Sequence, residues 1–347
     1  MKSIKCALGA VRSAVSKGGV VLLNVSNGNA TITANNGSFQ IATVCSHVGL
    51  KNGAYAVDGG IANFVHMLTD EITLQVTGSK MQVRTRNGRF TFGMLDPCAV
   101  PVMEEPKAAH SIECEELKKL LSSVSGAMAA DDVRSYLNGC HLFSRDKHLV
   151  AEASNGHVLA MNKIAFNGEF NAIVPYKVVK ELLRVIPNDG DTFIGSEEGK
   201  IIMKFDDVTL VASTLDGVFP ETEKIVKATK GCGYLTLNGE QLLSGLELAS
   251  FAVDSTGIQI TAQANGIRLE AGTAEKTAME DISAVVDGSI NSVKFALSPS
   301  YLSAAVAACN ECDEVAVGVS TDEASPVLVR PNSASSNLNW VIARLRI

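Results

Sequence analysis

Four small or polar residues, Ser154, Asn155, Gly156 and His157, interrupt a strand-like apolar run near the middle of the chain. A glycine lets another backbone segment approach closely, and the other three supply hydrogen-bonding groups beside apolar neighbours. A purely structural sheet would not need such an interruption. The pattern therefore predicts the lip of a binding cleft, in which apolar burial gives affinity and a few polar groups give orientation.

No catalytic pattern accompanies this predicted cleft. The sequence has no GxSxG elbow, no glycine-rich phosphate loop followed by Lys-Ser or Lys-Thr, and no HExxH helix. Its six histidines show no metal-ligand spacing, and the single CxxC, Cys309 with Cys312, lacks a second half, which favours helix-end cysteines over a zinc or redox site. We therefore expect a non-catalytic protein without cofactor or metal; a hydrolase is the weakest alternative.

Length and composition indicate a compact protein of several domains. The chain has 347 residues, of which 46% are hydrophobic and 19% charged, enough apolar material for two or three cores. Its apolar runs are shorter than the roughly 20 residues of a membrane span, and no signal-like segment opens it, so we expect a cytoplasmic location with free thiols. The net charge of −7 does not exclude nucleic acid, because the placement of the positive charges decides.

Two segments predict amphipathic helices with basic outer faces. In PYKVVKELLRVI (175–186) the valines, leucines and isoleucine recur at helical spacing, so Lys177, Lys180 and Arg184 fall together on the exposed face. In CEELKKLLSSVS (114–125) the same spacing points Lys118 and Lys119 away from the core. An ordinary solvated helix surface is the alternative for both.

Internal repetition is the strongest feature of the whole chain. Residues 55–95, 172–215 and 295–329 share one plan, a strand, a short helix and two more strands, at a spacing of about 120 residues, and a weaker helix-first unit precedes each copy. The strands alternate with period two and are separated by Asn-Gly turns, which is typical of antiparallel sheets. We predict an α+β protein of three similar domains, 1–106, 107–226 and 227–347, each with two helices and a curved antiparallel sheet. The proline-rich segment 96–106 would be a stiff linker.

Several ordered segments together resemble the bacterial replicative sliding clamp, the beta subunit of DNA polymerase III. They are VRSYLNG, ASNGHVLA, IVPYKVVKELLRVI, STLDGVFPE and the terminal WVIARLRI, and they span nearly the whole chain. The resemblance implies the DNA clamp fold, in which two chains join head to tail as a homodimer ring around double-stranded DNA. It implies a processivity factor that tethers DNA polymerase, clamp loader and repair proteins through short peptide motifs.

The resemblance also assigns residues to two surfaces. A sliding ring needs diffuse attraction to phosphates and no base reading, and the expected DNA-facing residues are Arg12, Lys17, Lys118, Lys119, Arg134, Tyr136, Lys177, Lys180 and Arg184. The expected wall of the peptide pocket is Leu137, Ser154, Gly156, His157, Leu159, Pro220, Lys224, Ile225, Ser325, Val341, Ala343, Leu345, Arg346 and Ile347.

Departures from the family pattern leave an alternative function open. Asn155 and Val158 replace the usual aspartate and arginine around the glycine-histidine pair, and Ala343-Arg344-Leu345 replaces methionine-proline-methionine. The predicted helices of the third domain carry no lysine or arginine. The N-terminal segment is short for an opening strand and helix. The alternative is a clamp-like adaptor or decoy that binds clamp-motif peptides without productive encirclement of DNA. As subunit contacts we expect edge strands at 89–94 and 258–264, with Phe90, Phe92 and Ile260 near the seam.

Overall fold

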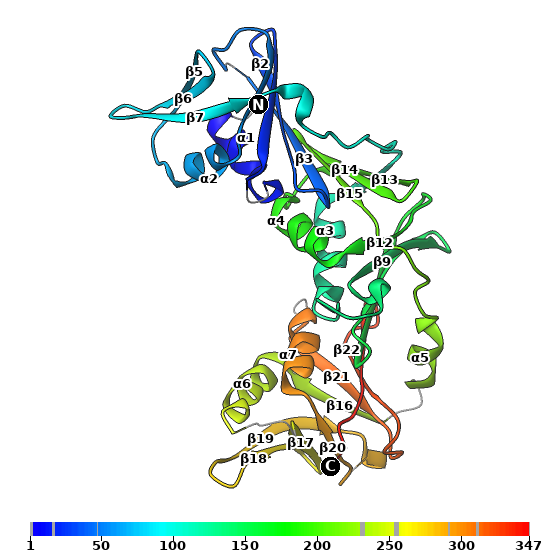
Figure 1. Ribbon diagram of the computed structural model, residues 1–347. Helices are drawn as coiled ribbons and strands as arrows, with labels where there is room; N and C mark the ends of the chain where they lie inside the picture. The colour runs from blue at the N-terminus through cyan, green and yellow to red at the C-terminus, as the bar shows by residue number, and fades with distance from the viewer. Residues whose placement is uncertain are drawn as a thin grey trace. The chain divides into compact units, whose positions relative to one another are not determined.

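The computed structural model describes residues 3–15, 18–46, 48–229, 233–252, 257–290, 292–309 and 312–346. The chain divides into two compact units (Figure 1): unit 1 holds Met1–Lys118 and Gly168–Thr214, and unit 2 holds Lys119–Asn167 and Leu215–Ile347. Each unit combines helices with a large antiparallel sheet, so the predicted α+β class is confirmed. The division into three domains predicted from the repeats stays a prediction.

The sheet of unit 1 follows the strand order β5-β6-β7-β4-β1-β2-β3-β15-β14-β13-β8. The strands of this unit are β1 Val20–Ser26, β2 Asn29–Asn35, β3 Phe39–Cys45, β4 Gly53–Asp58, β5 Thr73–Thr77, β6 Lys80–Arg84, β7 Arg89–Leu95, β8 His110–Glu113, β12 Asn171–Pro175, β13 Asp191–Glu197, β14 Lys200–Phe205 and β15 Val208–Ser213. Asn27 and Gly28 both have positive φ, as a tight hairpin turn requires, and join β1 to β2.

The helices of unit 1 bury the apolar stripes predicted for them. They are α1 Ile4–Ala10, α2 Gly60–Met67 and α4 Tyr176–Val185, with the short 3-10 turns η1 Arg12–Ala14 and η2 Pro97–Ala99; α3 Cys114–Ser125 begins in this unit. In α4, Val178, Val179 and Leu182 are fully buried, whereas Lys177 and Lys180 are exposed. The N-terminal segment, which is short for an opening strand and helix, forms the helix α1. Among the described residues no strand precedes α1.

The proline-rich segment 96–106 lies along the sheet of unit 1 instead of spanning free solvent. The backbone N–H of Met103 donates to the buried Gln40 side-chain oxygen at 2.8 Å, and Lys204 forms an ion pair with Glu105 at 2.8 Å. A chain that hydrogen-bonds to a sheet loses the freedom of a linker. The role of the segment as a linker between domains stays a prediction; the structure adds that the segment is bonded to the sheet through Met103 and Glu105.

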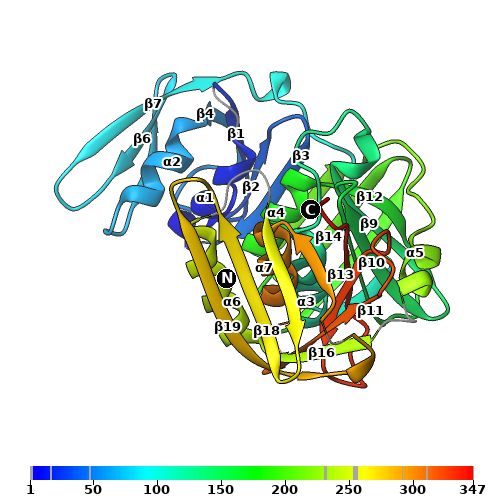
Figure 2. The ribbon, with the colours of Figure 1, turned by 90° about the horizontal axis from the view of Figure 1, so that it is seen from below.

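The sheet of unit 2 contains the order β9-β10-β11-β23-β22-β21-β16-β19-β18-β17-β20. Its strands are β9 Gly139–Arg145, β10 His148–Ser154, β11 Val158–Ala165, β16 Gly233–Asn238, β17 Ile258–Gln263, β18 Gly266–Gly272, β19 Thr277–Val286, β20 Lys294–Leu297, β21 Glu314–Val319, β22 Val327–Pro331 and β23 Asn339–Ile342. Figure 2 shows β17, β18 and β19 running side by side as long neighbouring ribbons.

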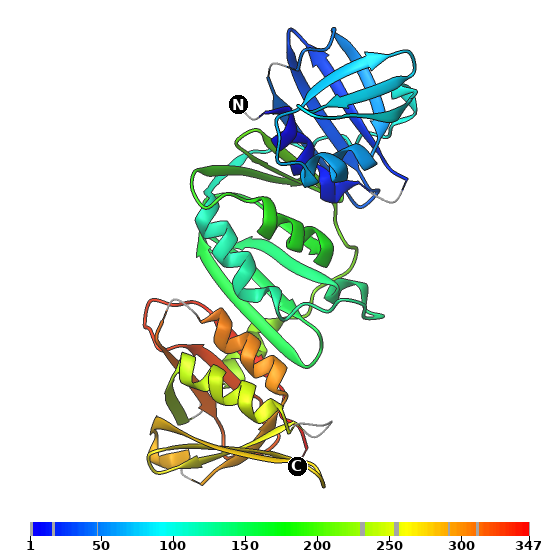
Figure 3. The same cartoon turned by 90° about the vertical axis from the view of Figure 1, so that its left-hand side faces the viewer.

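The helices of unit 2 include a pair that covers one face of this sheet. The elements are α5 Thr222–Ala228, α6 Gly239–Ser250, α7 Pro299–Ala308, the second half of α3, and the 3-10 turns η3 Ser135–Leu137 and η5 Gly288–Ile290. Figure 3 shows α6 and α7 side by side in front of the strands. Of these, α5 was not predicted from the sequence.

The core of unit 2 is built around Trp340 of β23, the only tryptophan of the chain. Its side chain is 1% exposed, and its indole N–H donates to the Ser123 carbonyl oxygen of α3 at 3.0 Å. A Cβ on Gly126, just beyond α3, would lie 3.2 Å from the indole ring. The close approach of this glycine lets the end of α3 pack directly on the ring.

The structure separates the two predicted edge strands. β17 pairs with β18 on one side and β20 on the other, and Ile260 is 2% exposed, so the prediction of an edge at 258–264 is wrong. β7 pairs with β6 from Arg89 to Gly93 and with β4 only at Met94 and Leu95. Within the described part of the chain, one flank of β7 at 89–93 therefore has no strand partner.

The cysteines of the described ranges are free thiols. Cys309 is buried at the end of α7, its thiol donates to the Ala305 carbonyl oxygen, and burial raises its pKa to about 12. Among the described residues, no three histidine, cysteine or acidic side chains come together as metal ligands. Nor does any helix in those ranges have both the length and the apolarity to cross a membrane.

Candidate functional site

An apolar cluster in unit 2 joins four elements that are far apart in the sequence. Leu159 of β11, Val226 of α5, Leu328 of β22 and Val341 of β23 pack together, each at most 5% exposed. Val341 lies directly opposite Leu159 on one side and Leu328 on the other, because β23 is the strand between β11 and β22. Half-buried Met161 and Tyr234 pack against the cluster from its margin. The cluster and the two half-buried side chains form a continuous apolar region, the kind of surface against which another apolar side chain can be buried.

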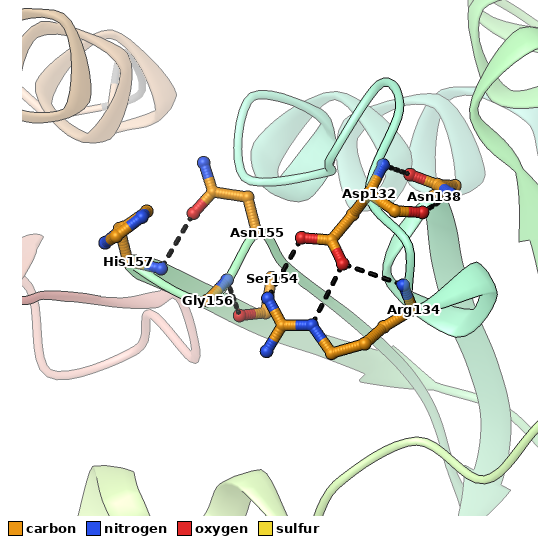
Figure 4. A network of polar contacts seen from close by, with 7 residues as sticks. All are labelled: Asp132, Arg134, Asn138, Ser154, Asn155, Gly156 and His157. Atoms are coloured by element: carbon orange, nitrogen blue, oxygen red, sulfur yellow. Dashed lines mark hydrogen bonds and ion pairs between the residues drawn. The ribbon is translucent and has the colours of Figure 1, made fainter.

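The Ser154–His157 turn connects β10 to β11 and ends two residues before Leu159 of the cluster. The Ser154 hydroxyl donates to the Val158 carbonyl oxygen at 2.7 Å. It also accepts from the Gly156 N–H, and the Asn155 side-chain oxygen accepts from the His157 N–H at 3.0 Å (Figure 4). Gly156 has φ +88°, a conformation that favours glycine. The polar interruption seen in the sequence is therefore a tight turn. The side chains of Ser154 and Asn155 form hydrogen bonds with the backbone of the turn itself.

A salt bridge covers the turn. The Arg134 guanidinium donates to both oxygens of Asp132, each at 2.9 Å, and a Cβ on Gly156 would lie 2.7 Å from its outer nitrogen (Figure 4). Asn138 accepts from the Asp132 N–H at 2.7 Å and donates back to its carbonyl oxygen. The Arg134 guanidinium is thus paired with the Asp132 carboxylate and is not a free cation.

From the Arg134–Asp132 ion pair we predict how the stability of the folded turn depends on pH. The Arg134 side-chain hydrogen bond, with its backbone N–H, lowers the pKa of Asp132 to about 2. Because an unfolded aspartate titrates near about 3.9, the pair stabilises the folded turn fully above about pH 4 and loses that effect as pH falls through about 2. We expect a carboxyl titration by NMR to show the low midpoint, and Arg134→Ala to raise it toward about 3.9. An Asp132 midpoint that Arg134→Ala leaves unchanged would contradict the assignment; Arg145→Ala is the control.

The C-terminal segment runs past the turn on its other side. The Ala343 N–H donates to the His157 carbonyl oxygen at 2.9 Å, and the His157 ring is stacked 6.4 Å from that of Tyr301. Leu345 turns toward β20: its N–H donates to the Ala296 carbonyl oxygen at 2.9 Å. The structure thus brings His157 and Ala343 together, and it directs Leu345 to a different strand.

Helix α5 carries two of the residues assigned to the pocket wall, Lys224 and Ile225. Val226 points into the apolar cluster, whereas its neighbour Ile225 is 44% exposed. Lys224 is exposed and pairs with Glu221, one turn back. The sequence analysis assigned Ile225 to the pocket and not Val226. Helix α5 was not predicted, and it is this helix that places the two neighbouring side chains on different faces. Pro220 lies exposed just before α5.

The other assigned pocket residues have separate places. Leu137 is buried at the end of η3, Ser325 bonds to Asp322 in the loop before β22, and Arg346 is exposed. Ile347 lies outside the described residues. The residues that sequence reasoning missed are Val226, Leu328, Met161 and Tyr234. No local motif marks them, since they meet only through the sheet order.

A buried polar group lies behind α5. Glu152 of β10, 4% exposed, has one carboxylate oxygen 2.9 Å from Nδ1 of His141 on β9, and the other accepts from the hydroxyl of Thr222, the first residue of α5. The His141 ring stacks on Phe143 at 4.5 Å and on Phe219 at 5.4 Å. This network connects the start of α5 to two strands of the sheet.

The basic residues assigned to DNA differ in how free they are. In unit 1, the Arg184 guanidinium pairs with buried Glu181 at 2.5 Å and donates to the Ser13 hydroxyl at 3.1 Å. Lys118 is held by the Asn188 side chain at 2.7 Å. Lys177 and Lys180 are exposed, and the Lys180 ammonium lies 4.5 Å from the Tyr176 ring centre. Arg184 is also exposed but is paired with Glu181, so Lys177 and Lys180 are the exposed cations of α4 without an ion pair to a described residue.

The remaining DNA assignments are scattered. Arg12 is half-buried in η1, Lys119 is exposed on α3, and Tyr136 packs edge-on against Phe219 in unit 2. Lys17 lies outside the described residues. α6 and α7 carry no basic residue, as expected from the sequence.

Comparison with known proteins supports the family prediction. Residues 111–221 match the family model described as DNA polymerase III beta subunit, central domain. The resemblance to bacterial beta sliding clamps is confirmed. The Beta sliding clamp of Rickettsia bellii is 25% identical over 248 residues, which cover 65% of this chain and 64% of that protein. The Pseudomonas aeruginosa protein of the same name is 31% identical over 57% of this chain and 54% of its own length. The matched region thus spans about two thirds or less of these curated relatives.

The clamp fold itself extends over the whole chain. A crystal structure of the DNA polymerase sliding clamp from Pseudomonas aeruginosa superimposes with a TM-score of 0.90 and 22% identity, covering 99% of this chain and 97% of the other. The sliding clamp from Caulobacter crescentus gives a TM-score of 0.88 at 20% identity. At such identities the likeness establishes the fold alone, and the predicted DNA clamp fold is confirmed.

Proposed function

We propose that this protein is a DNA sliding clamp, a non-catalytic processivity factor that acts in the cytoplasm and requires no cofactor. The observation that carries the proposal is the match of residues 111–221 to the central domain of the DNA polymerase III beta subunit. The relatives named Beta sliding clamp support the same conclusion. The three domains 1–106, 107–226 and 227–347 are part of this proposal.

The active form would be a homodimer ring closed head to tail. The unpartnered flank of β7 at 89–93 supports it, since a strand edge with open hydrogen-bonding groups can pair with another chain. Light scattering over a dilution series should give a species near twice the chain mass of 36.5 kDa. A monomer at every concentration would argue against a stable ring.

Inside the ring, DNA would be held by diffuse charge. Lys177 and Lys180 are the best candidates, because they are exposed on one face of α4 and form no ion pair with a described residue. Arg184, which is paired with Glu181, would contribute less. The absence of basic residues from α6 and α7 suggests a weak overall attraction.

The DNA role predicts a difference between topologies. With a bacterial clamp loader, the protein should stay on nicked circular DNA through gel filtration and be lost after linearisation. Lys177→Glu with Lys180→Glu should shorten the retention and lower the salt dependence of duplex binding by a slope of about 2 per chain. Lys51→Glu with Lys163→Glu, two exposed lysines outside the helices, is the charge-matched control. Equal retention on linear and circular DNA would contradict encirclement.

The partner site would be the apolar cluster of unit 2. An apolar side chain from a short peptide segment of a polymerase, a clamp loader or a repair protein would rest against Leu159, Val226 and Val341. The changed C-terminal residues favour a second candidate, an adaptor or decoy that binds such peptides without encircling DNA. Peptide binding together with failure on circular DNA would select this alternative.

A further inference from the structure

Buried Glu152 and Thr222 form a polar network with the half-buried His141 in unit 2. A carboxylate taken out of water costs free energy unless hydrogen bonds compensate. Here both oxygens of Glu152 have partners, the His141 ring nitrogen and the Thr222 hydroxyl. All five residues of β10 between its two ends are buried, so the carboxylate is surrounded by protein. Such a satisfied buried group fixes geometry more than it adds stability.

The element fixed in this way is α5. It has seven residues, too few for a helix to be stable without tertiary contacts, and its N-cap residue Glu221 makes no side-chain capping bond. Thr222 is 5% exposed and replaces that cap as the point of attachment. Phe219, three residues earlier, stacks on the His141 ring. The chain entering α5 is therefore held at two points by groups on β9 and β10.

The attachment is transmitted directly to the apolar cluster. Thr222 and Val226 are four residues apart, hence on one face of α5, and both are buried. When Thr222 is held by Glu152, Val226 is held against Leu159 and Val341. A shift of the helix start would move Val226 by a similar amount and change the width of the site.

We infer that His141, Glu152 and Thr222 position α5 and so set the opening of the apolar site for its partner peptide. They are positioning residues, since none of them belongs to the cluster itself. The inference rests on the proposed peptide-binding function and adds which residues fix the geometry of the site before a peptide binds. Preorganisation of this kind raises affinity because less conformational entropy is lost when the peptide binds.

Two threonine substitutions test the inference. Thr222→Val keeps the shape of the side chain and removes the hydroxyl, whereas Thr222→Ser keeps the hydroxyl. The probe is a fluorescein-labelled synthetic pentapeptide with two leucines and a terminal phenylalanine, followed by anisotropy with the full chain. We expect Thr222→Val to bind about tenfold more weakly, and Thr222→Ser to bind as the unchanged protein does. Hydrogen exchange of the α5 amides should accelerate in Thr222→Val and return to normal in Thr222→Ser.

A matched control separates positioning from general stability. Thr192→Val removes the hydroxyl of another buried threonine, bonded at 3.1 Å to the Lys204 carbonyl oxygen in unit 1. It should cost comparable stability and leave peptide binding within about twofold. If it weakens binding as much as Thr222→Val, or if Thr222→Val binds normally, the inference is overturned. If Thr222→Val does not fold, His141→Phe replaces it, because the phenylalanine retains the stacking on Phe143 and Phe219.

The same titrations distinguish failure of the inference from failure of the site. Leu159→Asp places a charge in the cluster and should abolish binding of the pentapeptide. Binding that Leu159→Asp abolishes and Thr222→Val leaves intact refutes only the positioning role. No binding by the unchanged protein, or binding that Leu159→Asp leaves intact, refutes the proposed site and the inference with it.

Discussion

Replacing Trp340 by alanine is expected to lower the free energy of unfolding by about 3–5 kcal/mol. The side chain is 1% exposed, fills the space between β23 and the end of α3, and bonds to the Ser123 carbonyl oxygen. Removal leaves a cavity and an unpaired buried carbonyl oxygen. Since the tryptophan itself is lost, unfolding in urea should be followed by far-ultraviolet circular dichroism.

Trp340→Phe is the control for this substitution. It retains most of the ring volume and loses the indole N–H, so its cost should be clearly smaller than that of alanine. Equal effects of the two variants would mean that the hydrogen bond to Ser123, and not packing, dominates. A loss below about 1 kcal/mol for Trp340→Ala would contradict the central place of this residue in unit 2.

Gly195→Ala is expected to destabilise unit 1 by about 1–3 kcal/mol or more. A Cβ at this position of β13 would lie 1.9 Å from the Lys107 carbonyl oxygen, which is backbone and has to move. The substitution therefore pushes residues 103–109 away from the sheet. We expect a lower urea midpoint, and faster proteolysis of this segment than in the unchanged protein.

Gly93→Ala in β7 is the matched comparison. It is also a strand glycine, but nothing lies within 4 Å of the Cβ that it would gain. Its effect should stay within about 0.5 kcal/mol. If both glycines tolerate alanine equally, the contact between the segment and the sheet contributes little.

The sequence predicted the repeated elements well, because their signals are local. The apolar stripe of PYKVVKELLRVI and the Asn27-Gly28 turn each require only a few neighbouring residues to be recognised, and both are found as predicted. Helix α5 was missed, since TEKIVKA is short and its apolar residues are too few to define a period. The edge at 258–264 was wrong because strand order depends on pairings across the whole sheet.

The candidate site was predictable only where it follows a motif. The Ser154–His157 turn and the pairing of Leu159 with Val341 correspond to segments that carried the family resemblance. The network behind α5 could not be predicted, because Glu152 and Thr222 are 70 residues apart and neither has a distinctive neighbourhood. Contacts of this kind are decided by the folded sheet and leave no periodic trace in the chain.

The docking of residues 96–106 on the sheet has a practical meaning for labelling and fusion of this protein. By composition the segment would be chosen as the place to insert a tag, a cleavage site or a second domain. Since Met103 is bonded to buried Gln40 and Glu105 to Lys204, extra residues there would break contacts that hold the segment to the sheet. The exposed turn at Ala274 and Glu275, between β18 and β19, is the better site for an insertion.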